Sequence, residues 1–214
     1  MNTLPEVKQV IYVVDDDEAM RDSMTWLLEG EGYTVACYDS GESFLAAYHE
    51  EMRGCLVLDV RMLEMSGLEM HELLLDRGSL LPVIFVTGHG DVPMAVSALQ
   101  RGACDFIEKP FHNEDLLSRI RRALAVDCQK ASRRKRSDAI AQRLELLTLR
   151  EREVMNLVVA GKLNKQIADE LNISMKTVEA HRARVMDKMG VRTLAELVRI
   201  ALEREPETET ATRQ

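Results

Sequence analysis

The chain of 214 residues is 30% charged, its four cysteines form no C-x-x-C pair, and no stretch approaches the roughly 20 apolar residues of a membrane span. Since MNTLPEVKQV also lacks the basic-then-apolar pattern of a secretory signal, we expect a cytoplasmic protein with no membrane partner. Residues 1–127 hold 10 Lys and Arg against 23 Asp and Glu (net −13), whereas residues 128–214 hold 18 against 13 (net +5). This asymmetry indicates two domains. The second domain is basic enough for a nucleic-acid or an acidic protein partner.

Short apolar runs alternate with helical patterns five times in the first half of the chain. The apolar runs predict buried parallel strands at residues 10–14, 34–38, 55–59, 82–87 and 104–107. Apolar residues at helical spacing, with Ser40 and Asp91 as N-caps, predict helices near residues 20–30, 40–48, 68–75, 91–101 and 113–124. This order predicts a doubly wound α/β domain, (βα)5 and flavodoxin-like, over residues 1–125.

Polar side chains stand where four of these strands end. They are Asp15, Asp16, Asp59, Thr87 and Lys109. Because the carboxyl ends of parallel strands face one crevice, we expect these side chains to meet. Carboxylates packed together repel one another, so a cation must bind there or one carboxyl must take up a proton. Three carboxylates, a hydroxyl and an ammonium suit a hard divalent cation and a phosphoryl group.

The second half of the chain is predicted to be helical throughout. Residues 126–146 contain neither Pro nor Gly and predict a helical linker, whose basic run at 133–136 we interpret as a solvated helix face rather than a phosphate contact. Four helices are expected within residues 147–204, marked by a Thr148–Glu151 capping box, Gly161, the N-cap Ser174, Gly190 and a Thr193–Glu196 capping box. The polar residues 205–214 are expected to be disordered.

Four motifs in the first half closely resemble the receiver domain of bacterial two-component response regulators. They are VVDDDEAMR at residues 13–21, LVLDVRM with MSG at 56–67, VTGHGDV at 86–92 and DFIEKPF at 105–111. The resemblance implies that Asp59 is the phosphoacceptor and that Mg²⁺ is held by Asp16, Asp59 and the backbone carbonyl of Arg61, with Asp15 in support. It also implies that Lys109 pairs with the transferred phosphoryl group, and Lys109–Pro110 is a candidate cis peptide.

The same resemblance implies a switch and a slow loss of the phosphoryl group. The Thr87 hydroxyl would donate to the phosphoryl group, and Phe106 would enter the space that it leaves. Taken singly, Thr87 fits an ordinary strand end and Phe106 an ordinary core aromatic. Leu63 stands where the family usually has Pro, so the loop beside Arg61 is expected to be looser. Arg61 and His89 occupy positions that influence hydrolysis of the phosphoryl group in receivers.

Residues 147–202 resemble the LuxR-type helix-turn-helix. On the third helix of this segment, Val178, Val185 and Met189 recur at helical spacing and are expected to face the core. The DNA-facing set is then Lys176, Thr177, Glu179, Ala180, Arg182, Ala183, Arg184 and Lys188, joined by Lys165 from the helix before it. We expect Arg182, Arg184, Lys188 and Lys165 to contact phosphates, and Glu179, Ala180 and Ala183 to read base edges. A salt bridge from Glu179 to Arg182 or Arg184 is an equally good interpretation.

The leading hypothesis is a phosphorylation-activated transcriptional regulator resembling the FixJ and NarL group, nearer to FixJ. It implies a sensor histidine kinase, promoter DNA, RNA polymerase and a second copy of the chain as partners. A metal-dependent phosphatase or phosphotransferase with an Asp59 nucleophile is a rival, although such chemistry wants a second carboxylate where Arg61 stands. A receiver with a protein-binding output is the third possibility.

Overall fold

The computed structural model describes residues 8–88, 96 and 99–202. The chain divides into two compact units, Met1–Ala131 and Ser132–Gln214. The predicted helix at 91–101 with its N-cap Asp91, and the predicted tail at 205–214, lie wholly or largely outside the described residues. Among the described helices, none is both long and apolar enough to cross a bilayer.

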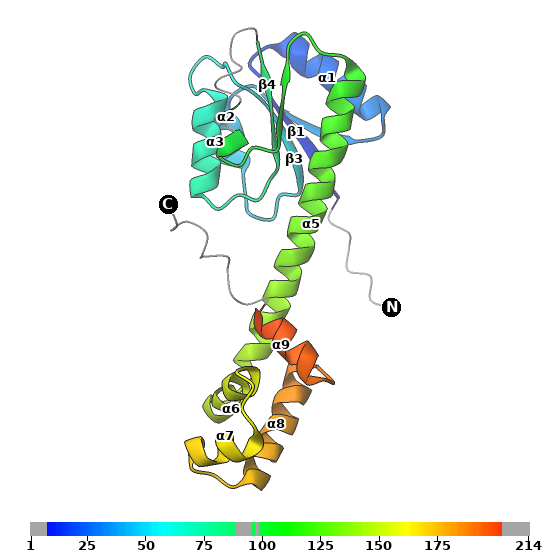
Figure 1. The fold of residues 1–214 in the computed structure, drawn as a ribbon. Helices are drawn as coiled ribbons and strands as arrows, with labels where there is room; N and C mark the ends of the chain where they lie inside the picture. Colours follow the sequence, from blue (N-terminus) through cyan, green and yellow to red (C-terminus); the bar gives the residue numbers. More distant parts are fainter. Residues whose placement is uncertain (1–7, 89–95, 97–98, 203–214) are drawn as a thin grey trace. The chain divides into compact units, whose positions relative to one another are not determined.

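The first unit is built on a five-stranded parallel sheet in the order β2-β1-β3-β4-β5 (Figure 1). Its strands are β1 (Val10–Val14), β2 (Thr34–Tyr38), β3 (Gly54–Asp59), β4 (Val83–Thr87) and β5 (Asp105–Glu108). Every predicted strand is present within one or two residues of its expected bounds. Neighbouring strands are in register at their carboxyl ends, where Asp59 lies beside Val86 and Thr87 beside Glu108.

Helices cover both faces of this sheet (Figure 1). On one face α1 (Glu18–Gly30) and the first half of α5 (Asn113–Glu145) bury Met24, Leu28, Leu116 and Ile120 against the strands. On the other face α2 (Gly41–Ala47) and α3 (Gly67–Asp76) bury Phe44, Leu45, Met70 and Leu74. Strands buried on both faces need apolar residues at every position, which explains the uninterrupted runs in the sequence. The doubly wound prediction is therefore confirmed.

Helix α5 joins the two predicted helical segments 113–124 and 126–146 into one helix of 33 residues. The absence of Pro and Gly lets it continue. Near its middle, Asp127 is buried, and its carboxylate accepts hydrogen bonds from Nε and Nη2 of Arg53 and from the side-chain amide of Gln9. These contacts hold α5 against the end of the sheet at which β3 begins.

Within the described residues, the second unit contains the last turns of α5 and four further helices. They are α6 (Leu149–Val159), α7 (Asn164–Leu171), α8 (Met175–Met189) and α9 (Leu194–Leu202). The Thr148–Glu151 capping box, the N-cap Ser174 and the left-handed Gly190 are all present as predicted. The Thr193–Glu196 box is only half formed, because the Glu196 carboxylate accepts from the backbone N–H of Arg192 instead of Thr193. Val178, Val185 and Met189 are buried in the core, as their spacing predicted.

Candidate functional site

The acidic residues after β1 and at the end of β3 gather at the carboxyl edge of the sheet. Asp15, Asp16 and Asp59 each offer a carboxylate oxygen within 4.8 Å of the other two. Asp15 and Asp59 are buried and Asp16 is exposed. Neighbouring parallel strands bring them together, since Val14 pairs with Leu58 one step before each acidic position. This is the cluster that the strand ends predicted.

Lys109 reaches this acidic cluster from the segment after β5. Its Nζ lies 2.9 Å from Asp15 Oδ2 and 3.4 Å from Asp59 Oδ2. The backbone N–H of Lys109 donates to the carbonyl of Thr87 at 2.7 Å, and the Lys109–Pro110 peptide is cis, as expected. The ammonium therefore lies where a group attached to Asp59 would meet it.

The charges in the cluster perturb one another. Burial raises the pKa of Asp59 above its ordinary value; the Lys109 ammonium opposes this effect, and the Asp15 carboxylate adds to it. For Lys109, burial lowers the pKa, but its bonds to Asp15 and its attraction to Asp59 outweigh that effect, so its pKa is raised. A cation beside Asp59 therefore stabilises the ionised form of its carboxylate. The raised pKa keeps Lys109 charged at neutral pH.

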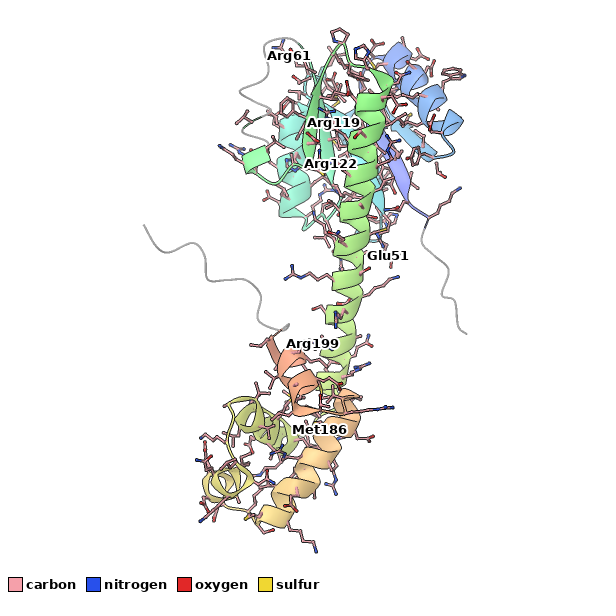
Figure 2. All side chains as sticks on the ribbon, turned by 45° about the vertical axis from the view of Figure 1, so that its right-hand side comes forward. Glu51, Arg61, Arg119, Arg122, Met186 and Arg199 are labelled. Carbon is pink, nitrogen blue, oxygen red and sulfur yellow. The ribbon has the colours of Figure 1, made fainter. Side chains whose placement is uncertain are left out.

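Three closely placed carboxylates form a donor set that suits Mg²⁺. Hard divalent cations prefer carboxylate oxygens, and Mg²⁺ keeps several waters of its own, so a cluster of one exposed and two buried carboxylates fits this ion. Arg61, labelled in Figure 2, lies at the end of the sheet where α5 begins, two residues after Asp59. Its backbone N–H also lowers the pKa of Asp59, although burial dominates.

The predicted switch residues lie on neighbouring strands. Thr87 is fully buried, and its Oγ1 donates to the carbonyl of Gly88 at 3.2 Å. Phe106 pairs with Phe85 across β4 and β5 and packs partly buried against the core below α2 and α3. His89 lies outside the described residues.

Gly67, part of the MSG motif in the sequence, shapes the loop that follows Asp59. The Gly67 N–H donates to the carbonyl of Val60 at 3.0 Å. A Cβ at residue 67 would lie 2.1 Å from the carbonyl oxygen of Asp59. Only Gly allows the backbone to approach so closely. The Gly of the MSG motif is therefore the one sign of this approach in the sequence. Leu63, in contrast, is 91% exposed and leaves the loop without the restraint of Pro.

In the second unit, α8 presents most of the residues predicted to face DNA. Lys176, Glu179, Ala180, Ala183 and Arg184 are exposed on α8, and Lys165 is exposed on α7. Thr177 is half-buried, and its backbone N–H donates to Ser174 Oγ. The guanidinium of Arg182 donates to Asn164 Oδ1 at 2.6 Å, which links α8 to the start of α7.

Lys188 differs from the other residues in this set because the fold already holds its ammonium. Its Nζ donates to Glu151 Oε2 at 2.7 Å and to the carbonyl of Leu146 at 3.0 Å. Glu151 is buried, and its bonds to Lys188 and to the backbone of Thr148 lower its pKa from 4.5 to about 2. Helical spacing placed Lys188 on an outward face, but it could not show that α6 supplies a carboxylate there.

The chain matches two families and several regulators. Residues 11–121 match the response regulator receiver domain, and residues 145–201 match the bacterial regulatory proteins of the luxR family. The chain is 44% identical over 191 residues to the response regulator protein TodT of Pseudomonas putida, covering 89% of this chain and 84% of that protein. It is also 44% identical over 196 residues to the transcriptional regulatory protein FixJ of Bradyrhizobium diazoefficiens, covering 90% and 94%.

The chain belongs to the response regulators. This response regulator is similar to the solved structure of StyR, with a TM-score of 0.83 and 40% identity over 92% of this chain and all of that one. Full-length FixJ from B. japonicum gives a TM-score of 0.58 at 43% identity, covering 93% and 98%. A receiver joined to a LuxR-type domain makes this response regulator a DNA-binding transcriptional regulator of a two-component system. Its relatives favour that function over the rival phosphatase.

Proposed function

We propose that Asp59 of this regulator accepts a phosphoryl group and that the modified receiver controls DNA binding by α8. The observation that carries this proposal is that Asp15, Asp16, Asp59 and Lys109 meet at the carboxyl end of the sheet. An Asp59 carboxylate oxygen attacks the phosphorus of a phosphohistidine on a sensor kinase. The new O–P bond replaces the P–N bond, and the leaving imidazole takes up a proton.

The residues around Asp59 each have a part in that transfer. When bound, Mg²⁺ neutralises charge on the phosphoryl oxygens, and Asp16, Asp59 and the Arg61 carbonyl would hold it, with Asp15 in support. Lys109 stays charged and moves from Asp59 to an oxygen of the new phosphoryl group. Slow hydrolysis of the acyl phosphate returns Asp59 to its starting state, and Arg61 and His89 occupy the positions that influence its rate in receivers.

Asp16→Asn should weaken Mg²⁺ binding without harming the fold, because the Asp16 side chain is exposed. A ligand that binds only the folded state stabilises it by about 2.7 kcal/mol at one hundred times its Kd. Wild type should therefore melt at a higher temperature as Mg²⁺ is added, and Asp16→Asn should respond much less at the same concentrations. The matched control is Asp22→Asn, an exposed carboxylate on α1. An equal thermal response in all three proteins would contradict the metal site.

Phosphorylation of Asp59 is proposed to cause a conformational change in Thr87 and then in Phe106. Their strands are adjacent, and Thr87 needs only to exchange the Gly88 carbonyl for a phosphoryl oxygen as its acceptor. The phosphoryl group adds about −2 of charge with strong acceptor oxygens, which is enough to bias a loop between two arrangements. Phe106 then moves into the released space, and the receiver pairs with a second copy.

On the DNA side, α8 is proposed to enter the major groove. Glu179, Ala180 and Ala183 would lie against base edges, while Lys165, Lys176, Thr177, Arg182 and Arg184 would contact the backbone. Pairing of two copies would place two such helices on one promoter site, since a single small module makes few contacts. Bound there, the dimer would contact RNA polymerase.

Arg184→Ala should reduce the salt dependence of DNA binding, because Arg184 is exposed on α8 and is proposed to neutralise one phosphate. Each phosphate contact contributes about −0.9 to the slope of log K against log salt concentration. A salt titration on a selected duplex should therefore give a slope shallower by about 0.9 for this variant. Arg150→Ala, which removes an exposed cation paired with Glu153 on α6, should keep the wild-type slope. The same slope for Arg184→Ala as for wild type would contradict the contact.

A further inference from the structure

A cavity of about 330 Å³ lies in the second unit, between the final turns of α5, the turn at Gly190 and α9. The described residues that line it all belong to this unit, which begins at Ser132. Its volume is at the lower end of the range of about 300–1,000 Å³ that is usual for small-molecule sites. The cavity therefore suits a ligand of the size of a mononucleotide.

Three guanidinium groups face one carboxylate among the described residues that line this cavity. The guanidiniums belong to Arg136 and Arg143 on α5 and to Arg199 on α9, which is labelled in Figure 2. The carboxylate belongs to Glu196, one turn before Arg199. These four side chains carry a net charge of +2. A guanidinium has five N–H donors, so the bonds that an arginine makes within the fold leave donors for a ligand.

The fold holds one of these guanidiniums in place. Nη1 of Arg143 donates to the carbonyl of Met189 at 3.0 Å. A Cβ added at Gly190 would lie 3.4 Å from Nη1 and 3.6 Å from Cζ of Arg143, so the guanidinium packs against the backbone of Gly190. The orientation of Arg143 is therefore set before any ligand arrives. A group that is already ordered loses less conformational entropy on binding.

The rest of the described lining is mainly apolar. Ile140 and Val191 are buried and Ile200 is half-buried, and all three contribute to the wall. An apolar wall with a few placed polar groups is the usual composition of a site for an organic ligand. An inorganic anion would contact the guanidiniums but leave this wall without a partner. The lining thus favours an anion with an apolar part.

We propose that this cavity binds a small organic phosphate, such as a nucleoside monophosphate, through Arg136, Arg143 and Arg199. A phosphate monoester carries a charge of about −2 at neutral pH, which matches the net charge of the four charged side chains. Guanidiniums bind phosphate oxygens through pairs of parallel N–H bonds, and the apolar wall would contact the rest of the ligand. The inference goes beyond the proposed function, because it needs neither phosphorylation of Asp59 nor DNA binding by α8.

The test is a titration of the full chain with adenosine 5′-monophosphate in the absence of Mg²⁺, followed through amide NMR signals. The signals of Gly190 and Val191, which lie in the cavity wall, should shift and saturate with a Kd at or below about 1 mM. Adenosine lacks the phosphate and inorganic phosphate lacks the apolar part. Each should therefore bind at least about tenfold more weakly.

Substitutions of opposite charge should move the affinity in opposite directions. Arg199→Gln should weaken binding about tenfold, because it removes a charged donor from the wall. Glu196→Gln should tighten binding about twofold or more, because it removes a like charge. Its amide oxygen can still accept the N–H of Arg192 at the start of α9. The matched control is Arg150→Gln, an exposed cation on α6 in the same unit, which should keep the wild-type affinity.

Arg136→Gln on α5 repeats the test from a second helix, and should also weaken binding about tenfold. In each variant the amide signals of α7 should keep their wild-type positions, which separates loss of the site from loss of the fold. Equal weakening by Arg150→Gln and Arg199→Gln would overturn the proposal, since it would show attraction to the overall charge alone. So would the absence of a saturable shift, or weaker binding by Glu196→Gln.

DNA is the other source of phosphate groups, and a further titration distinguishes it from a small ligand. A duplex recovered by selection from random sequence is added in place of the nucleotide. It should leave the signals of Gly190 and Val191 unchanged, and Arg199→Gln should bind it as wild type does. If the duplex shifted these signals and lost affinity with Arg199→Gln, the cavity would hold a DNA phosphate and the proposal of a small ligand would be wrong.

Discussion

Asp59→Asn should gain no phosphoryl mass when mixed with Mg²⁺ and acetyl phosphate, whereas wild type gains one phosphoryl group per chain. The amide keeps the size of the side chain but lacks the anionic oxygen that attacks phosphorus. Its fold should survive, because burial raises the pKa of Asp59 and ionised Asp59 is therefore a cost to the folded state. Mass spectrometry of the intact protein makes the measurement.

The control for this variant is Asp39→Asn, which changes an exposed carboxylate just after β2. It should gain the same mass as wild type. If Asp59→Asn took up as much phosphate as wild type, another residue would be the acceptor and the account of the acidic cluster would be wrong. If wild type took up none, phosphoryl transfer to this chain would itself be in question.

Glu151→Gln should destabilise the second unit by about 1–3 kcal/mol at neutral pH, because it removes the charge that holds the Lys188 ammonium. The effect should vanish in acid. The pKa of Glu151 is about 2 in the folded state and 4.5 ordinarily, so its stabilising effect is complete above about pH 4.5 and is lost as the pH falls towards 2. Urea unfolding of the full chain at several pH values, followed through the helical signal, gives both results.

The matched control is Glu153→Gln, two residues away on the exposed face of α6. Its carboxylate pairs with Arg150, with about half of each side chain exposed. Exposed pairs of this kind contribute little, so the free energy of unfolding should change by less than about 1 kcal/mol. If the two variants changed the free energy of unfolding equally, the buried Glu151 would contribute no more than an exposed glutamate. A Glu151→Gln effect that persists unchanged at low pH would also contradict the ion pair.

The elements of the fold were predictable wherever a local rule decides them. The strand ends at Asp15, Asp59 and Thr87 follow from uninterrupted apolar runs, and parallel pairing brings them to one edge. The Thr148–Glu151 box and the left-handed Gly190 are likewise set by residues within one turn. The acidic cluster and its lysine could therefore be placed from sequence alone.

Three features of the fold depend on contacts that spacing along the sequence does not reveal. Lys188 has the spacing of an exposed residue, but Glu151 reaches it from α6. The importance of Gly67 depends on a carbonyl of Asp59 that folds back against it. The Thr193–Glu196 box failed by one residue, since the carboxylate of Glu196 finds the N–H of Arg192 first. For Lys188, spacing identifies the direction of the side chain, and its partner comes from the tertiary fold.

Control of DNA binding by a phosphoryl group on Asp59 is tested by comparing the DNA affinities of wild type and Asp59→Asn. Wild type and Asp59→Asn are titrated onto the same duplex, recovered by selection from random sequence, with Mg²⁺ and with or without acetyl phosphate. Phosphodonor should tighten binding by wild type at least about fivefold and leave binding by Asp59→Asn unchanged. The same tightening in both proteins, or none in wild type that carries the phosphoryl group, would contradict the claim.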